Sequence, residues 1–261
     1  MTIVPRRSYM ICTAPRSGST LLCMLLAQTG VAGEPDSHFH APSLAGWLAD
    51  YGLKETDFPS ERDALRAVFR TALERGRGGT NTFGLRMQRH SFDHFLQQLE
   101  IVFPGRMKDA ERIGQAFGPT LYVHLSRSDR VDQAISLLRA EQTGLWHRRA
   151  DGTELERLAP PRQPRYDAGA IAQRIRELTE QDDAWERWFE KEGLAPLRIT
   201  YDDLSDDPRK VLAKVLSALG SEPDLARFAH APTARLANDE SRQWRRRFLS
   251  EIDGAGRWTA S

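Results

Sequence analysis

The hydrophobic pattern of the chain alternates short segments of strand character with longer amphipathic segments. Strands are predicted over residues 9–12, 80–87, 120–125 and 197–201. Between and after them, apolar residues return at spacings of three, four and seven, which predicts helices. Two helices are predicted to begin at Ser19 and directly after Asp129. The others are predicted over 41–51, 60–75, 92–103, 107–117, 167–192, 208–219 and 239–252. Strands that alternate with helices predict an α/β fold with a parallel central sheet flanked by helices on both faces.

Residues 147–165 interrupt this alternation, because they are polar, charged and rich in proline. We expect a long excursion there within a single domain that covers 1–261. The helix over 167–192 carries Trp185 and Trp188 on its apolar stripe, where they are expected to be core residues and not a ligand platform.

Composition narrows the class of protein. The chain has 261 residues, of which 40% are hydrophobic, so it can bury a substantial core. Its net charge of +1 gives no general reason to expect nucleic acid or a membrane surface as partner. The two cysteines, Cys12 and Cys23, fall in a predicted strand and helix and are expected to be buried thiols. No apolar run approaches the ~20 residues that span a membrane. We expect a cytoplasmic protein, with the apolar run after Arg7 forming a strand and not a signal peptide.

The segment after the first strand has the character of an anion-binding loop. Residues 14–19 are small or polar and lead from a buried strand into a helix start, whose first backbone amides lack intrahelical partners. Arg16 adds a positive charge, and we expect Arg16, Ser17, Gly18, Ser19 and Thr20 to hold the anion. A Walker A loop would have Lys where Ser19 stands, which argues against an Mg-nucleotide hydrolase. The alternative is a tight turn that binds nothing.

Arg16 to Leu22 (RSGSTLL) resembles the 5′-phosphosulfate loop of sulfotransferases, which use 3′-phosphoadenosine-5′-phosphosulfate (PAPS). Three further segments, Gly30 to Pro35, Phe83 to Arg86 and Arg130 to Trp146, resemble the bacterial trehalose 2-sulfotransferase family. The similarity covers most of the chain. It implies a P-loop nucleotide-kinase-like fold, PAPS as co-substrate and a homodimer.

The resemblance also assigns roles. Arg127 and Ser136 would hold the 3′-phosphate of PAPS, a pairing that suits a phosphate dianion. Their spacing is one residue longer than is common in sulfotransferases, so Arg130 is the alternative to Arg127. Glu34, in Gly-Glu-Pro, would be the general base that accepts the proton of an acceptor hydroxyl. The alternative for Glu34 is a surface carboxylate paired with an arginine.

The acceptor is expected to be a sugar or glycolipid. Arg86, in the segment that resembles the family, and His38 are candidate contacts, although His38 can equally be a solvated loop residue. The pair His38 and His40 has no matching ligand cluster, so we expect no metal. Gln142 and Trp146 suit a sugar ring, and Trp146 can equally cap the core.

Basic residues near the C-terminus are a further candidate for the nucleotide. Arg235 and the arginines of 242–247 would close over it, although a solvated helix face explains the cluster as well.

Two other functions remain open from the sequence. An ATP-dependent small-molecule kinase would use the same scaffold but lacks the Walker lysine. A non-catalytic nucleotide-binding protein would keep the loop without turnover.

Overall fold

The computed structural model describes residues 7–230 and 239–255, and for 253–255 it describes the backbone alone. The chain forms two compact units. The sheet unit comprises residues 7–126 and 181–230, and the second unit comprises 127–180 and 239–255. The single domain expected over 1–261 stays a prediction.

The sheet unit is built on four parallel strands in the order β2-β1-β3-β6. The strands are β1 (Arg7–Thr13), β2 (Thr82–Gln88), β3 (Thr120–Ser126) and β6 (Leu197–Thr200). The helices are α1 (Ser19–Gln28), α2 (Leu44–Tyr51), α3 (Glu61–Arg77), α4 (Arg89–Val102), α5 (Asp109–Phe117), α8 (Tyr201–Asp206) and α9 (Pro208–Ala218), with short 3-10 turns at Glu55–Asp57 and Pro223–Phe228. The predicted α/β class with a parallel sheet is therefore confirmed.

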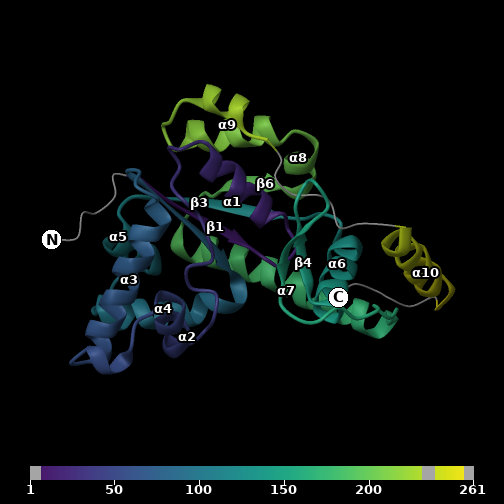
Figure 1. The fold of residues 1–261 in the computed structure, drawn as a ribbon, viewed down its shortest axis with the longest axis horizontal. Helices are drawn as coiled ribbons and strands as arrows, with labels where there is room; N and C mark the ends of the chain where they lie inside the picture. The colour runs from purple at the N-terminus through teal and green to yellow at the C-terminus, as the bar shows by residue number, and fades with distance from the viewer. Residues whose placement is uncertain (1–6, 231–238, 256–261) are drawn as a thin grey trace. The chain divides into compact units, whose positions relative to one another are not determined.

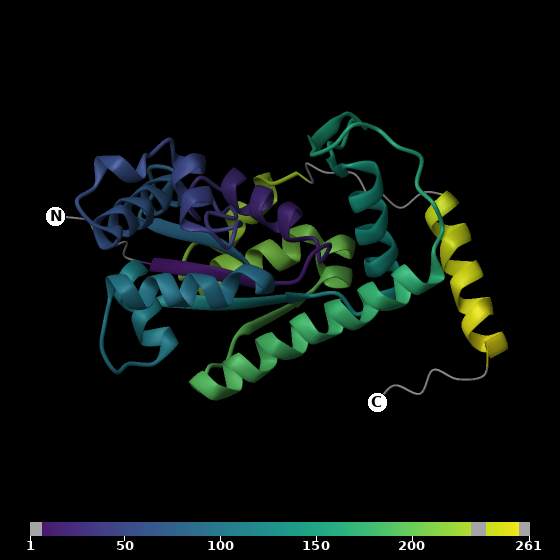
Figure 2. The same ribbon diagram turned by 90° about the horizontal axis from the view of Figure 1, so that it is seen from below.

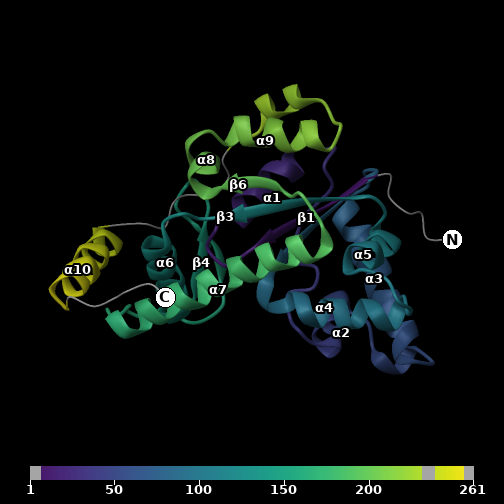
Figure 3. The ribbon, with the colours of Figure 1, turned by 180° about the vertical axis from the view of Figure 1, so that it is seen from behind.

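Both faces of this sheet are covered, because side chains of a strand point alternately to its two sides. Met10 and Cys12 of β1 pack in the cluster with α2, α3, α4 and α5, while Tyr9 and Ile11 pack with α1, α8 and α9. Figure 1 shows the strands between these two layers, and Figure 3 shows α4 and α5 from behind. The buried run that predicted β1 reflects this two-sided packing.

The core of the first layer is aromatic. Phe39 lies within 5.0 Å of the rings of Phe69 and Phe95, measured between centroids, and Trp185 is fully buried beside Phe92. The core role predicted for Trp185 is confirmed. Cys12 and Cys23 are buried thiols as expected, and burial raises the pKa of Cys23 to about 12.

The second unit contains α6 (Arg130–Thr143), an antiparallel pair β4 (Leu145–Arg148) and β5 (Glu154–Arg157), and α10 (Asp239–Ala255). The helix α7 (Ala168–Glu192) begins in this unit, and its residues 181–192 belong to the sheet unit. The expected excursion over 147–165 includes most of a hairpin that was not predicted: β4 begins two residues before it, and β5 lies within it, ahead of its prolines. Its pattern was missed because both strands are half-exposed and carry many charged residues. Within the part of the chain described, no helix combines the length and apolarity needed to span a membrane.

Candidate active site

The predicted anion loop follows β1 and ends at a glycine-capped helix start. It covers residues 14–18 and leads into α1, which Figure 2 shows in the same purple as β1. Gly18 is the N-cap residue of α1, with a left-handed φ of 89° and no side chain to cap the helix amides. Arg16 also has a positive φ, 63°, which is uncommon for a residue with a side chain. The predicted strand, tight turn and helix start are confirmed, and such helix starts favour anions.

Gly18 is required by space as well as by conformation. A Cβ at this position would lie 2.7 Å from Cδ2 of Tyr201, the first residue of α8. Tyr201 therefore forms one wall of the loop. Local sequence pattern does not reveal this contact, because only the parallel pairing of β3 with β6 brings Tyr201 to the same edge of the sheet.

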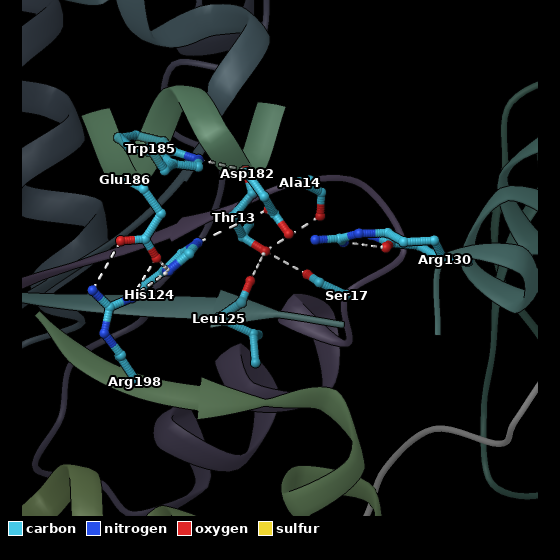
Figure 4. A network of polar contacts seen from close by, with 11 residues as sticks. Thr13, Ala14, Ser17, His124, Leu125, Arg130, Asp182, Trp185, Glu186 and Arg198 are labelled. Atoms are coloured by element: carbon cyan, nitrogen blue, oxygen red, sulfur yellow. Dashed lines mark hydrogen bonds and ion pairs between the residues drawn. The ribbon is translucent and has the colours of Figure 1, made fainter. Parts of the chain in front are cut away.

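The hydroxyl of Ser17 points into the fold. Ser17 is fully buried, and its Oγ is hydrogen-bonded to Oγ1 of Thr13, the last residue of β1. Thr13 Oγ1 donates to the carbonyl oxygen of Leu125 at 2.8 Å, and the Thr13 carbonyl accepts from Nε1 of Trp185 at 3.0 Å. Figure 4 shows these partners around Thr13. Thr13 was not among the predicted site residues, since the strand was expected to end at Cys12.

Glu34 lies on a second loop, held against the end of α3. Its backbone N–H donates to the carbonyl of Gly76 at 2.8 Å, and its side chain is exposed. The preceding Gly33 has a φ of 73°, and a Cβ there would lie 2.4 Å from the carbonyl oxygens of both Gly76 and Thr82. Gly78 lies directly against the Glu34 side chain. The backbone of this loop is thus fixed, while its carboxylate reaches solvent.

Arg86 joins the loop of Glu34 to the anion loop. It lies near the end of β2, and its three guanidinium nitrogens each donate to a different side chain: Thr20 Oγ1 at 2.7 Å, Ser37 Oγ at 2.8 Å and Asp36 Oδ1 at 3.1 Å. Its backbone N–H also donates to the carbonyl of Asp36 at 3.0 Å. The structure therefore brings Thr20 and the 34–38 loop together through a residue that was predicted to contact the acceptor. That acceptor contact stays a prediction.

The imidazole of His38 faces the interior. Its ring stacks on Phe83 with centroids 6.0 Å apart, and its Nε2 is buried with no hydrogen-bond partner among the described residues. Burial lowers the pKa of His38 against the opposing effect of Asp36. This geometry gives no support to an acceptor contact through the His38 ring. Across residues 7–230 and 239–255, no three His, Cys, Asp or Glu side chains gather as metal ligands would.

Arg127 and Ser136, the predicted 3′-phosphate ligands, belong to the second unit. Arg127 lies 3.8 Å from a carboxylate oxygen of Asp132, and Arg130 donates to the side chain of Gln133 at 2.7 Å. Asp129 is the N-cap of α6, the helix predicted to begin directly after it, and accepts a hydrogen bond from the backbone N–H of Asp132. The choice between Arg127 and Arg130 is not settled by these contacts, and the 3′-phosphate role stays a prediction.

The other candidates of the second unit have structural contacts of their own. Both amide atoms of Gln142 bond the backbone of Arg165, at 3.1 Å and 2.7 Å, and Trp146 is half-buried on β4. Arg245 of the C-terminal cluster donates to Asp129 and Asp132. Arg235 lies outside the described residues. The acceptor roles of Gln142 and Trp146 stay predictions.

A parallel α/β sheet whose first strand leads through a glycine-capped turn into a helix, with an exposed carboxylate on the loop that follows this helix, fits the class of group-transfer proteins. Comparison with known proteins specifies the class. A family model described as Stf0 sulphotransferase matches residues 8–251, so the chain belongs to the Stf0 sulphotransferase family. It is a sulfotransferase, which decides against the kinase and non-catalytic alternatives.

Curated relatives cover nearly the whole chain. The trehalose 2-sulfotransferase of Mycobacterium tuberculosis is 34% identical over 277 residues, spanning 96% of this chain and 97% of the relative. The trehalose 2-sulfotransferase of Mycolicibacterium smegmatis is 32% identical, spanning 95% and 97%. The resemblance identified from the motifs is thereby confirmed.

Two solved structures also align with the chain. A sulfotransferase domain from the Synechococcus PCC 7002 olefin synthase is 18% identical with a TM-score of 0.44, covering 94% of this chain and 95% of that one. A sulfotransferase from Alicyclobacillus acidocaldarius is 15% identical with a TM-score of 0.45, covering 97% and 96%.

Proposed function

We propose that this sulfotransferase uses PAPS as donor and binds its 5′-phosphosulfate at the loop of residues 14–18. The observation that carries the proposal is the opening of α1. The glycine N-cap leaves the first amides of the helix without a capping side chain. Arg16 lies two residues before this glycine in the sequence. Backbone donors and a positive helix end suit an anionic sulfate ester. Ser17 contributes its backbone to this site, because its hydroxyl is used by Thr13.

Glu34 is proposed as the general base. Its side chain is exposed on a fixed backbone, and Arg86 ties the neighbouring residues Asp36 and Ser37 to Thr20 at the start of α1. A sugar hydroxyl is a poor nucleophile until its proton is removed. Glu34 accepts that proton as the hydroxyl oxygen bonds to sulfur, and the electron pair of the broken S–O bond stays on the leaving phosphate. Arg16 and the helix amides stabilise the charge that develops there.

The acceptor is proposed to be a hydroxyl of a sugar, with trehalose as the first candidate. The support is the naming of the two relatives, each aligned over at least 95% of this chain. Arg127 or Arg130, together with Ser136, is proposed for the 3′-phosphate. A homodimer is the expected assembly, which sedimentation analysis would test.

The test of this function has a binding and a transfer arm. The thermal shift with 3′-phosphoadenosine-5′-phosphate (PAP) is expected to exceed that with ATP and Mg²⁺, and radiolabel from PAPS is expected to appear on trehalose. Glu34→Gln is expected to bind PAP normally and to lower kcat by about 10²-fold or more, since Gln has the same shape but cannot accept a proton. Unchanged turnover would remove Glu34 from the mechanism, and absence of a PAP shift would remove the donor assignment.

A further inference from the structure

The hydroxyl of Thr13 is the hydrogen-bonding centre beneath the anion loop. Thr13 is fully buried at the end of β1, and its Oγ1 contacts Ser17 Oγ, the carbonyl of Leu125 and, at 3.3 Å, the carbonyl of Ala14. These groups come from the loop itself and from the neighbouring strand β3. The side chain therefore links the anion loop to the centre of the sheet (Figure 4).

Counting protons fixes the direction of these bonds. A threonine hydroxyl has one proton, and the carbonyl of Leu125, at 2.8 Å, is its nearest carbonyl acceptor. The hydrogen bond between the two hydroxyls then needs the proton of Ser17. Ser17 therefore donates to Thr13, and its hydroxyl has no proton left for a bound anion. The backbone N–H of Ser17 is the group that can donate to the anion, and the hydrogen bond to Thr13 sets its orientation.

The carbonyl of Thr13 is held from the other side by α7. Trp185 Nε1 donates to it at 3.0 Å, and the next residue, Glu186, accepts from His124 of β3 at 3.0 Å and from Arg198 of β6 at 2.8 Å. The hydrogen bonds from Arg198 lower the pKa of Glu186, so this carboxylate stays charged. Glu186 thus anchors α7 to two strands in a position where Trp185 reaches the loop.

We infer that Thr13 and Trp185 are positioning residues that hold the anion loop in its binding conformation. Arg16 and Gly18 both have positive φ angles, so the loop departs from the conformations that a chain adopts by default. Thr13 holds the loop through Ser17, between these two residues, and Trp185 fixes the point at which the loop leaves the strand. The inference rests on the proposed function only for the identity of the anion.

A matched pair of threonines tests the role of Thr13. Thr13→Val keeps the shape but leaves the Ser17 hydroxyl and the Leu125 carbonyl without their partner. Thr120→Val is the control: its hydroxyl also bonds a serine hydroxyl (Ser8, 2.7 Å) and a carbonyl (Gly118, 2.9 Å), but at the opposite edge of the sheet. Thr13→Ser retains the hydroxyl and is the conservative rescue.

Two readouts are measured on the full chain. The first is the Kd for PAP by calorimetry, and the second is hydrogen exchange of the amides of 14–20 in the protein without ligand. Thr13→Val is expected to weaken PAP binding about tenfold or more and to speed exchange in 14–20. Thr120→Val, at a similar loss of Tm, is expected to change neither by more than about twofold, and Thr13→Ser to stay within about threefold of the wild type. Thr13→Val combined with Ser17→Ala is expected to bind no more weakly than Thr13→Val alone.

The two readouts separate the inference from the proposed function. If Thr13→Val exchanges and binds like the wild type, or Thr120→Val weakens binding equally, Thr13 is not a positioning residue. If the wild type does not bind PAP, the donor assignment fails, while faster exchange in Thr13→Val would still support the inference.

Discussion

Gly78→Ala is a small change that acts on the proposed general base without altering it. Gly78 ends α3 with a left-handed φ of 51°, and a Cβ added there would lie 2.2 Å from Cγ of Glu34 and 3.3 Å from its Cβ. Ordinary contact begins at 3.4 Å, so Cγ must move by more than 1 Å. The main chain of Glu34 cannot follow easily, because its N–H is bonded to Gly76. The side chain must therefore rotate, and its carboxylate moves with it.

The magnitude follows from the geometry. A displacement of ~1 Å at a catalytic group costs about 10²-fold in rate, because the proton acceptor leaves hydrogen-bond reach of the hydroxyl. A positive φ in alanine adds a stability cost of ~1 kcal/mol, which is separate from the effect on rate. We expect Gly78→Ala to lower kcat about 10²-fold while the Kd for PAP is unchanged, since the anion loop is not touched.

The neighbouring glycine supplies the control. Gly79 also has a positive φ, 81°, but a Cβ there meets nothing within 4 Å. Gly79→Ala therefore has the backbone strain without the contact, and its kcat should stay within about threefold of the wild type. The assay is transfer of label from PAPS to the acceptor, with Tm recorded for each variant. Equal turnover in Gly78→Ala and Gly79→Ala, with slow turnover in Glu34→Gln, would refute the expected displacement of the Glu34 carboxylate.

Two further predictions concern the residues around this loop. Arg86→Met keeps the aliphatic part of the side chain but removes the hydrogen-bond donors to Thr20, Asp36 and Ser37. Because charge-assisted hydrogen bonds are lost, kcat/KM for the acceptor should fall about ten- to a hundredfold. A kcat/KM equal to that of the wild type would contradict the bridging role of Arg86. His38→Phe should flatten the acid side of the stability curve: burial lowers the pKa of His38 below 6.5, so as pH falls through 6.5 the unfolded state takes up a proton that the folded state does not, and the free energy of unfolding decreases. Urea denaturation at pH 7.5 and pH 5 gives the free energy of unfolding of each protein at both pH values. If this free energy falls by the same amount in the wild type and in His38→Phe, the prediction is refuted.

The strands and helices of the sheet unit could be predicted from the local hydrophobic pattern, because most of them have buried faces. The run over 9–12 predicted a strand covered on both faces, and Met10 and Ile11 pack in separate clusters on the two sides. Helix ends also depend on local sequence: Ser60, where a helix was predicted to begin, caps α3 by accepting a hydrogen bond from the N–H of Asp63. Short segments that the pattern missed, such as α8 and the β4–β5 hairpin, have few buried positions and many charges. In such segments too few apolar residues are present for a hydrophobic period to be recognised.

The sequence by itself determined the α/β class, the strand, turn and helix start of the predicted anion loop, and the position of the proposed base, because each depends on neighbouring residues. A strand, a glycine turn and a helix start follow one another within 9–28, and Gly33, Glu34 and Pro35 are adjacent. Tertiary structure alone decided which groups support them. Trp185 reaches Thr13 across 172 positions, and Arg86 reaches Thr20 across 66. Such contacts depend on how strands and helices stack, and a one-dimensional pattern fixes which face is buried but not which distant side chain it meets.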